Sequence, residues 1–190
     1  MTHRVGLDRH TVIQAAADLA DASGLDEVTL ATLAARLGIR SPTLYHYVNG
    51  LDGLRRELAL LGTRELARTL GRAVMGRSGA AAIEALALAY RAFAHAHPGL
   101  YNAALRAADP EDSTLLEAQA EVVEIALRVL AATQSDRDEA IHTVRIWRSM
   151  LHGFITLETN SGFGLPQDID ETFRRLVLLM IQATREDPTR

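Results

Sequence analysis

The sequence contains neither cysteine nor lysine. The absence of cysteine excludes disulfides, thiolate metal sites and cysteine nucleophiles. All 20 basic residues are therefore arginine, which we attribute mainly to coding bias, although arginine is also the better bidentate partner for phosphate and guanine. An excess of positive charge is missing as well, because the formal net charge is −4. Any surface that binds nucleic acid must therefore be local.

Long hydrophobic runs are also absent. The first residues, MTHRVGLDRHT, contain no apolar segment of the kind found in signal peptides, and apolar runs such as VLLMI at 177–181 are short. A membrane-spanning helix needs roughly 20 apolar residues. We therefore expect a soluble, cytoplasmic protein with no membrane partner. Its 190 residues are enough for one or two domains with their own cores.

Hydrophobic residues recur every three or four positions along most of the chain, and no long stretch alternates between apolar and polar residues. This pattern predicts an all-α fold. Three short helices fit within the first 48 residues, with Asp8, Thr29 and Ser41 as their capping residues. We therefore predict an N-terminal three-helix head at 1–50 and a six-helix body at 51–190. The body helices are expected at about 52–75, 80–97, 113–132, 136–160 and 168–185. A further short helix is expected after the second of these, and it should end at about residue 107.

The second and third helices, joined by LGIR at 37–40, have the lengths expected of a helix-turn-helix. Gly38 can supply the positive φ of the turn, and Pro42 fits the first turn of a helix. The polar side chains of TLYHY at 43–47 would face outward, where hydroxyl groups can reach phosphates and base edges. The alternative is an ordinary amphipathic turn whose tyrosines pack on the body, since this motif also occurs in proteins that bind no DNA.

The run TVIQAAADLADASGLDEVTLATLAARLGIRSPTLYHYVNGLDGLRRELA, residues 11–59, resembles the DNA-binding region of the TetR family of bacterial transcriptional regulators. The resemblance implies a homodimer whose recognition helices enter successive major grooves of a palindromic operator. It places phosphate contacts at Thr29 and Tyr47, and a contact of the N-terminal arm at Arg4. The groove-facing residues that it implies are Arg40, Ser41, Pro42, Thr43, Tyr45 and His46.

Two positions depart from the family pattern. The family usually has a phosphate-contacting lysine where this chain has Leu51, and the tetracycline repressor branch has a base-contacting arginine where this chain has Ala31. The loss of cationic contacts should weaken DNA binding and flatten its dependence on salt.

The segment WRSMLHGF at 147–154 resembles the Trp-His-Gly signature of one TetR-type C-terminal domain class. The resemblance implies a dimer interface in which the last two helices of each subunit form a four-helix bundle. The alternative is that the apolar stripes of these helices belong to the core of one chain. The interface residues that we predict are Phe154, Leu157, Phe173, Leu176, Val177 and Met180.

The same resemblance implies a cavity in the body for an unknown small effector, and the apolar excess favours a hydrophobic or aromatic molecule. For each aromatic residue, ordinary core packing is the alternative. The histidines do not form a convincing metal set, and no cofactor is expected. The residues that we predict for the pocket are Leu61, Glu65, Tyr90, Phe93, His97, Tyr101, Leu105, Glu117, Trp147 and Met150.

The sequence has no phosphate loop, serine elbow, HExxH or dinucleotide fingerprint, so we do not expect an enzyme. It predicts a ligand-responsive transcriptional regulator, namely a homodimeric repressor that its effector releases from operator DNA. The alternative is a helix-turn-helix-derived module that binds a ligand or a protein partner without specific DNA binding.

Overall fold

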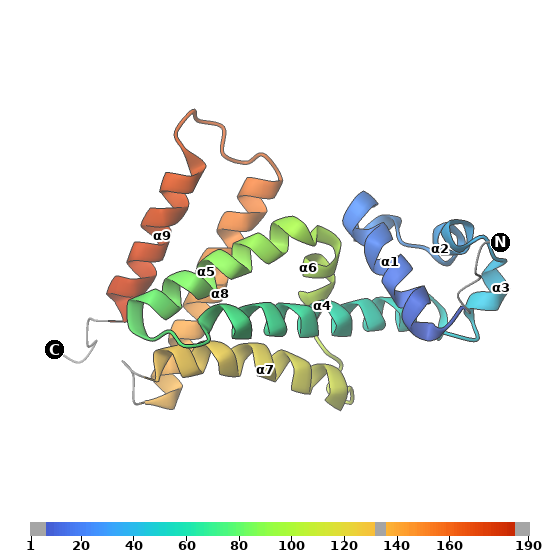
Figure 1. Ribbon diagram of the computed structural model, residues 1–190, viewed down its shortest axis with the longest axis horizontal. Coiled ribbons are helices and arrows are strands. Elements are labelled where there is room, and N and C mark those ends of the chain that lie inside the picture. The colour runs from blue at the N-terminus through green and yellow to red at the C-terminus, as the bar shows by residue number, and fades with distance from the viewer. Residues whose placement is uncertain (1–6, 132–135, 185–190) are drawn as a thin grey trace. The chain divides into compact units, whose positions relative to one another are not determined.

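The computed structural model describes residues 7–131 and 136–184. Within these residues the chain forms nine α-helices, one short 3₁₀ helix and no strand (Figure 1). The prediction of an all-α fold is confirmed, and the helix limits agree with the expected ones to within a few residues. The helices are α1 Arg9–Ser23, η1 Leu25–Glu27, α2 Leu30–Leu37, α3 Ser41–Leu44, α4 Gly50–Val74, α5 Gly79–Ala96, α6 Pro98–Ala104, α7 Ser113–Leu130, α8 Arg137–Thr159 and α9 Ile169–Ala183.

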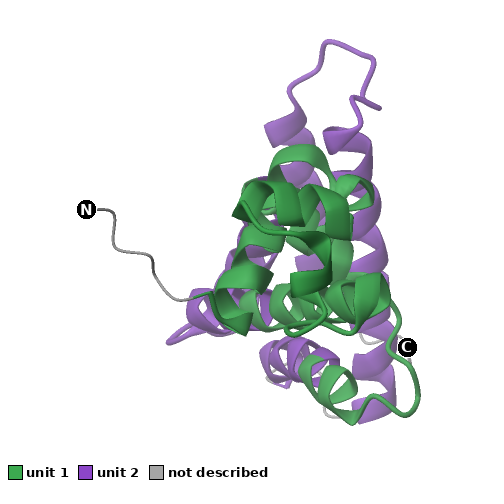
Figure 2. Ribbon diagram, turned by 90° about the vertical axis from the view of Figure 1, so that its right-hand side faces the viewer, with its two compact units in different colours: residues 1–65, 96–118 green, residues 66–95, 119–190 purple. Residues whose placement is uncertain are grey.

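The chain divides into two compact units (Figure 2). Unit 1 comprises Met1–Glu65 and Ala96–Ala118, and thus holds α1 to α3, the first part of α4, α6 and the start of α7. Unit 2 comprises Leu66–His95 and Gln119–Arg190, and thus holds the rest of α4 and α7 together with α5, α8 and α9. The head predicted for residues 1–50 lies within unit 1, whereas residues of the predicted body contribute to both units.

Side-chain caps and glycines set the limits of the first two helices. The Asp8 carboxylate accepts a hydrogen bond from the Thr11 N–H at 2.7 Å and so starts α1. At α2, Thr29 and Thr32 form a reciprocal capping box, in which each side chain accepts the backbone N–H of the other. Gly38 then ends α2 with φ of 65°, in the left-handed conformation that glycine adopts without strain.

The third helix begins differently from the sequence-based prediction. Arg40 is its N-cap residue, with an extended backbone and no side-chain capping bond, while Ser41 and Pro42 are already helical. The assignment of Ser41 as the cap is therefore wrong. After α3 the chain continues in tight turns, because the N–H groups of Tyr45, His46 and Tyr47 each donate to the carbonyl three residues earlier.

Within unit 1, α6 packs closely against α1 and α4, and glycine makes both contacts possible. A Cβ atom at Gly99 would lie 2.2 Å from the carbonyl carbon of Ala20 on α1. A Cβ atom at Gly62 on α4 would lie 2.3 Å from the carbonyl oxygen of Leu100. Neither position has room for a larger residue unless the helices move apart.

Asp21, on α1, caps the beginning of α6. Its Oδ1 accepts hydrogen bonds from the backbone N–H groups of Gly99 at 2.8 Å and Leu100 at 3.0 Å. Its Oδ2 lies 3.0 Å from Nδ1 of His97. The first N–H groups of a helix have no partner within the helix, and a negative charge there is favourable. A residue far away in the sequence therefore provides the cap, so α1 and α6 are held together.

In unit 2, Arg91 on α5 joins α8 to α9. Its guanidinium group makes a two-point hydrogen bond with the Glu158 carboxylate, and it lies 2.7 Å from Oδ1 of Asp170. The same group lies over the rings of Phe173, at 4.7 Å, and Phe154, at 5.8 Å. The hydrogen bonds from Arg91 lower the pKa of Glu158. Arg91 and Glu158 are mostly buried, with side chains 17% and 11% exposed, whereas the Asp170 side chain is 81% exposed.

Candidate nucleic-acid interface and effector region

Residues 40–47, which we call the reading segment, follow a rigid turn in unit 1. Two buried leucines, Leu33 on α2 and Leu44 on α3, are 0% exposed and hold the two helices together. In the turn, the Ile39 N–H donates to the Ala34 carbonyl at 3.0 Å, and Gly38 has its left-handed backbone. The packing of Leu44 inward leaves the neighbouring side chains on the outer side of the segment.

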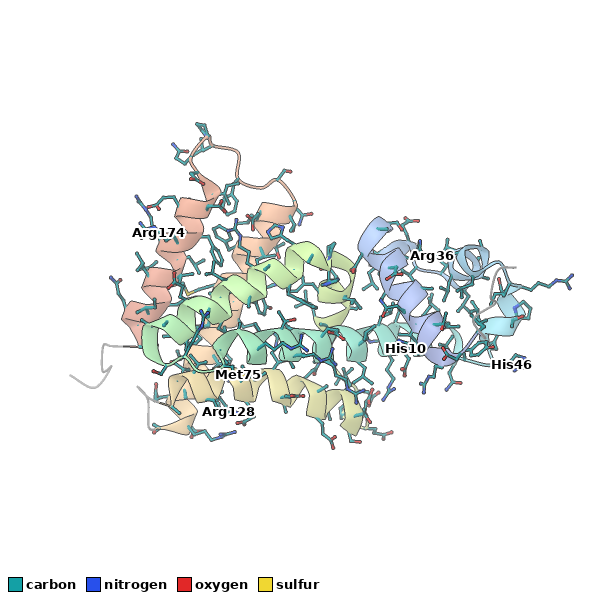
Figure 3. All side chains as sticks on the ribbon, viewed as in Figure 1. His10, Arg36, His46, Met75, Arg128 and Arg174 are labelled. Atoms are coloured by element: carbon teal, nitrogen blue, oxygen red, sulfur yellow. The ribbon has the colours of Figure 1, made fainter. Side chains whose placement is uncertain are left out.

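All six residues predicted to face the groove lie at least partly at the surface. Tyr45 is 62% exposed, which is unusual for an aromatic side chain. Figure 3 shows His46 beside α3, and this side chain is also exposed. Their contact with DNA remains a prediction. The exposed members of the set are Arg40, Pro42, Tyr45 and His46, and the half-buried members are Ser41 and Thr43.

The two predicted phosphate contacts of the described chain already have structural partners. The Thr29 hydroxyl belongs to the capping box at the start of α2. The Tyr47 hydroxyl donates to the carbonyl of Leu7, at 3.1 Å, and thereby fixes the chain in front of α1. A phosphate contact by either side chain would add to these roles or replace them. Arg4, predicted to contact DNA from the N-terminal arm, lies outside the described residues.

A surface hollow of about 510 Å³ lies beside the reading segment. It combines aromatic rings, imidazole and two guanidinium groups, which are the groups that commonly contact the DNA backbone. The sequence-based prediction did not include its two arginines. The lining residues are Arg9, Tyr45, His46, Tyr47, Val48, Asn49, Gly53, Arg56 and Glu57.

Both arginines of the hollow are paired with acids. Glu57 lies 2.8 Å from Arg9 and 3.0 Å from Arg56. Arg56 also makes two 2.5 Å hydrogen bonds to Asp112, which in turn accepts the Leu115 N–H at the start of α7. The hydrogen bonds from Arg56 lower the pKa of Asp112. These contacts connect α1, α4 and α7 within unit 1 and leave Arg9, at 62% exposed, as the more accessible cation.

The residues predicted for an effector pocket are divided between the two units. The four phenylalanine, tyrosine and tryptophan members are all buried, but His97 and Glu117 do not lie in the interior as expected. His97 is half exposed and faces Asp21 on α1, while Glu117 is exposed on α7 because its neighbours Leu115 and Ala118 face the core. The members in unit 1 are Leu61, Glu65, His97, Tyr101, Leu105 and Glu117, and those in unit 2 are Tyr90, Phe93, Trp147 and Met150.

Two buried polar atoms have no hydrogen-bond partner among the described residues. One is the hydroxyl of Thr63 on α4, and the other is the indole Nε1 of Trp147 on α8; each residue is 2% exposed. Such groups are uncommon in folded proteins. Trp147 was predicted from the sequence as a pocket residue, but Thr63 was not.

The predicted dimer residues on α8 and α9 separate into buried and exposed groups. Phe154 and Phe173 are 7% and 2% exposed, and their rings lie 5.1 Å apart within unit 2. Val177 and Met180 are equally buried. These four side chains therefore form core of the single chain, as the alternative interpretation of the stripes predicted, and leave a partner little to cover. The large apolar side chains that α8 and α9 expose are Ile146, Leu157, Leu178 and Leu179, while Leu176 is half-buried.

Both the N-terminal and the C-terminal regions of the chain match known protein families. Residues 12–58 match the family described as "Bacterial regulatory proteins, tetR family", and residues 83–180 match "Tetracyclin repressor-like, C-terminal domain". The HTH-type transcriptional regulator YobS of Bacillus subtilis (strain 168) is 36% identical over 172 residues, which are 90% of each protein. The chain belongs to the TetR family of bacterial transcriptional regulators.

A further relative and two solved structures are also similar to this chain. The HTH-type transcriptional regulator Rv0681 of Mycobacterium tuberculosis is 33% identical over 168 residues, which cover 86% of this chain and 74% of that protein. A solved structure of a protein from Rhodococcus sp. RHA1 shares the fold, with a TM-score of 0.81, 23% identity and coverage of 98% and 100%. A TetR variant from Acinetobacter baumannii AYE, solved in complex with minocycline, shares it with a TM-score of 0.70, 22% identity and coverage of 95% and 99%.

TetR-family membership confirms the class of function expected from the sequence, a ligand-responsive DNA-binding transcriptional regulator. The first matched region contains most of α1, all of α2 and α3, and the beginning of α4. It therefore includes the reading segment. The second runs from α5 into α9. No helix in the described part of the TetR chain is long and apolar enough to cross a membrane.

Proposed function

We propose that this TetR-family regulator is a homodimeric repressor that acts in the cytoplasm. It reads a palindromic operator with residues 40–47 and is released by a small apolar or aromatic effector. The exposure of Tyr45 supports the proposal most directly, because 62% of this side chain is in water next to fully buried Leu44. An aromatic ring in that position can contact thymine methyl groups, and its hydroxyl can reach phosphates.

The test is a measurement of DNA binding by the full-length protein, with fluorescent duplexes that tile its own promoter region. Tyr45→Ala should lower the affinity for the preferred duplex by about fivefold or more, because one specific contact contributes about 1–3 kcal/mol. The matched control is Met75→Ala, which removes another exposed side chain, 76% exposed beyond the end of α4 (Figure 3). Wild-type protein without sequence preference at low salt, or a Tyr45→Ala variant that binds normally, would refute the proposal.

The exposed apolar side chains of α8 and α9 support dimerisation. Ile146, Met150, Gly153 and Leu157 recur at helical spacing on one face of α8, where Ile146 is 57% and Leu157 50% exposed. A second copy of the chain can cover this face together with Leu178 and Leu179, through an interface that uses the same surface on both subunits.

Leu157→Asp should therefore shift the protein toward monomers in light-scattering measurements over a dilution series. Leu88→Asp on α5 is the control, because Leu88 is also 50% exposed but lies on another helix. If both variants stay dimeric, or both dissociate equally, the α8 and α9 face is not the interface.

The Asp21 cap supports a route for regulation within unit 1. Because α1 supplies the cap of α6, a shift of α6 changes the position of α1, and DNA that fixes α1 also fixes α6. Ligand and operator would then favour different populations of one equilibrium. Operator binding should slow hydrogen exchange of the Gly99 and Leu100 amides, and Asp21→Asn should remove this protection. Unchanged exchange in the wild-type complex would show that α6 does not respond to DNA.

One observation favours the alternative, a module without specific DNA binding. Acids pair with both arginines of the hollow, and Leu51 stands where the family usually has a cation. If the protein nevertheless binds operator DNA, Glu57→Gln should release Arg9 and steepen the salt dependence by about one counterion for each additional phosphate contact. If neither the wild-type protein nor Glu57→Gln binds DNA, or if the binding of both is independent of salt, the alternative is favoured.

A further inference from the structure

Trp147 occupies the buried face of α8 together with Leu151, Phe154 and Ile155. Its side chain is 2% exposed, yet its Nε1 has no hydrogen-bond partner among the described residues. An indole N–H is a donor and cannot accept. A donor buried without an acceptor destabilises a fold, and most buried polar groups are paired. The fold therefore retains an unfavourable group at this position.

No described residue of unit 2 accepts a hydrogen bond from this donor. The buried side chains of the unit are aliphatic or aromatic, and the hydroxyl groups among them belong to Tyr90 and Thr184. Thr184 donates its own O–H to the Ile181 carbonyl, and the backbone carbonyls of the surrounding helices already accept helical hydrogen bonds. A molecule that enters the unit can supply the missing acceptor.

We infer that Trp147 donates a hydrogen bond to the effector, which therefore carries an uncharged acceptor such as a carbonyl or ether oxygen on an apolar body. This inference rests on the proposed function, because it assigns a chemical class to the effector of that repressor. An anionic acceptor is disfavoured, since Arg91, a largely buried cation of unit 2, is already paired with Glu158 and Asp170.

The test uses two molecules of the same shape, acetophenone and α-methylstyrene. Acetophenone carries a C=O group, which can accept a hydrogen bond, where α-methylstyrene carries C=CH₂, which cannot. Trp147 is the chain's single tryptophan, so the full-length protein gives one indole N–H signal in a ¹H–¹⁵N NMR spectrum. Acetophenone should shift this signal downfield and bind about fivefold more tightly, which corresponds to one neutral hydrogen bond. Equal affinities, or no shift with either compound, would overturn the inference.

Two variants separate the hydrogen bond from general packing when the same pair is titrated by calorimetry. Trp147→Phe removes the donor and should bring the two affinities to within about twofold. Ile155→Val loosens the same buried face but keeps the indole, and it should preserve the preference for acetophenone. A preference that persists in Trp147→Phe would overturn the inference. Operator binding by the unliganded protein is measured separately, so failure of the repressor proposal is distinguishable from failure of this one.

Discussion

The Arg91 cluster leads to a quantitative prediction about stability. In the folded protein, the two carboxylate oxygens of Glu158 accept hydrogen bonds from Arg91. Glu158→Gln keeps the shape of this side chain but removes its negative charge and replaces one of the two accepting oxygens with an NH₂ group. The guanidinium group then stays over the rings of Phe154 and Phe173 with Asp170 as its remaining acidic partner. We expect a clear loss of stability, because a largely buried cation loses its main counterion.

The expected size follows from the exposure of the pair. Removal of one partner from a fully buried ion pair costs about 3–5 kcal/mol. Arg91 and Glu158 retain 17% and 11% exposure, and Asp170 stays in place. We therefore expect about 1–3 kcal/mol, which for a chain of this length lowers Tm by roughly 2–12 °C.

The effect should also depend on pH. The hydrogen bonds from Arg91, and a weaker contribution from His95, lower the pKa of Glu158 from its ordinary value of 4.5. A lowered pKa in the folded state means that the stabilisation is complete above 4.5 and is lost as the pH falls through the folded pKa. The difference between wild type and Glu158→Gln should therefore be largest near neutral pH and shrink in acid.

The assay is thermal unfolding followed by circular dichroism, at one protein concentration because dimerisation affects Tm. Glu171→Gln is the matched control. Glu171 also pairs with two arginines, Arg174 and Arg175, which lower its pKa to about 2, but its side chain is 40% exposed and those of its partners are 59% and 73% exposed. Exposed pairs contribute little, so this control should stay close to wild type. Equal shifts in the two variants, or a Glu158→Gln shift that does not change with pH, would refute the reasoning.

Three further substitutions test local packing by chemical denaturation. Gly62→Ala should destabilise by about 1–3 kcal/mol, because the new Cβ would lie 2.3 Å from the Leu100 carbonyl oxygen. Gly71→Ala on the same helix should instead stabilise by about 0.5–1 kcal/mol, since its Cβ would meet only the Ile125 Cδ1, at 3.8 Å; changes of the same sign at the two glycines would contradict this packing. Thr29→Ala should destabilise by about 1 kcal/mol through loss of the capping box, and an unchanged midpoint would show that the cap is dispensable.

Features that depend on nearby residues could be predicted from the sequence. The caps at Asp8 and Thr29 and the turn at Gly38 each involve groups within a few positions, and the structure contains all three. The start of the third helix could not be predicted as well, because serine is a common capping residue but Ser41 is already helical. In such a short helix, a shift of one residue is enough to change the role of a side chain.

Contacts between distant residues could not be predicted in this way. The Asp21 cap of α6 joins positions 78 apart, and the bond between Arg56 and Asp112 joins positions 56 apart. Periodicity identified apolar stripes on α8 and α9 but not which neighbour covers each side of them. Phe173, for example, was predicted to lie in the dimer interface, whereas in the structure it packs against Arg91 of its own chain.

The Asp21 cap has a consequence for genetics. A selection for alleles whose repression no longer responds to inducer should recover substitutions at Asp21 and Gly99, although neither residue belongs to the reading segment or to the buried face around Trp147. Such alleles would be missed if mutagenesis were restricted to the codons of residues that contact the ligand. In this protein, the junction of α1 and α6 is the region where the phenotypes of induction and of operator binding should overlap.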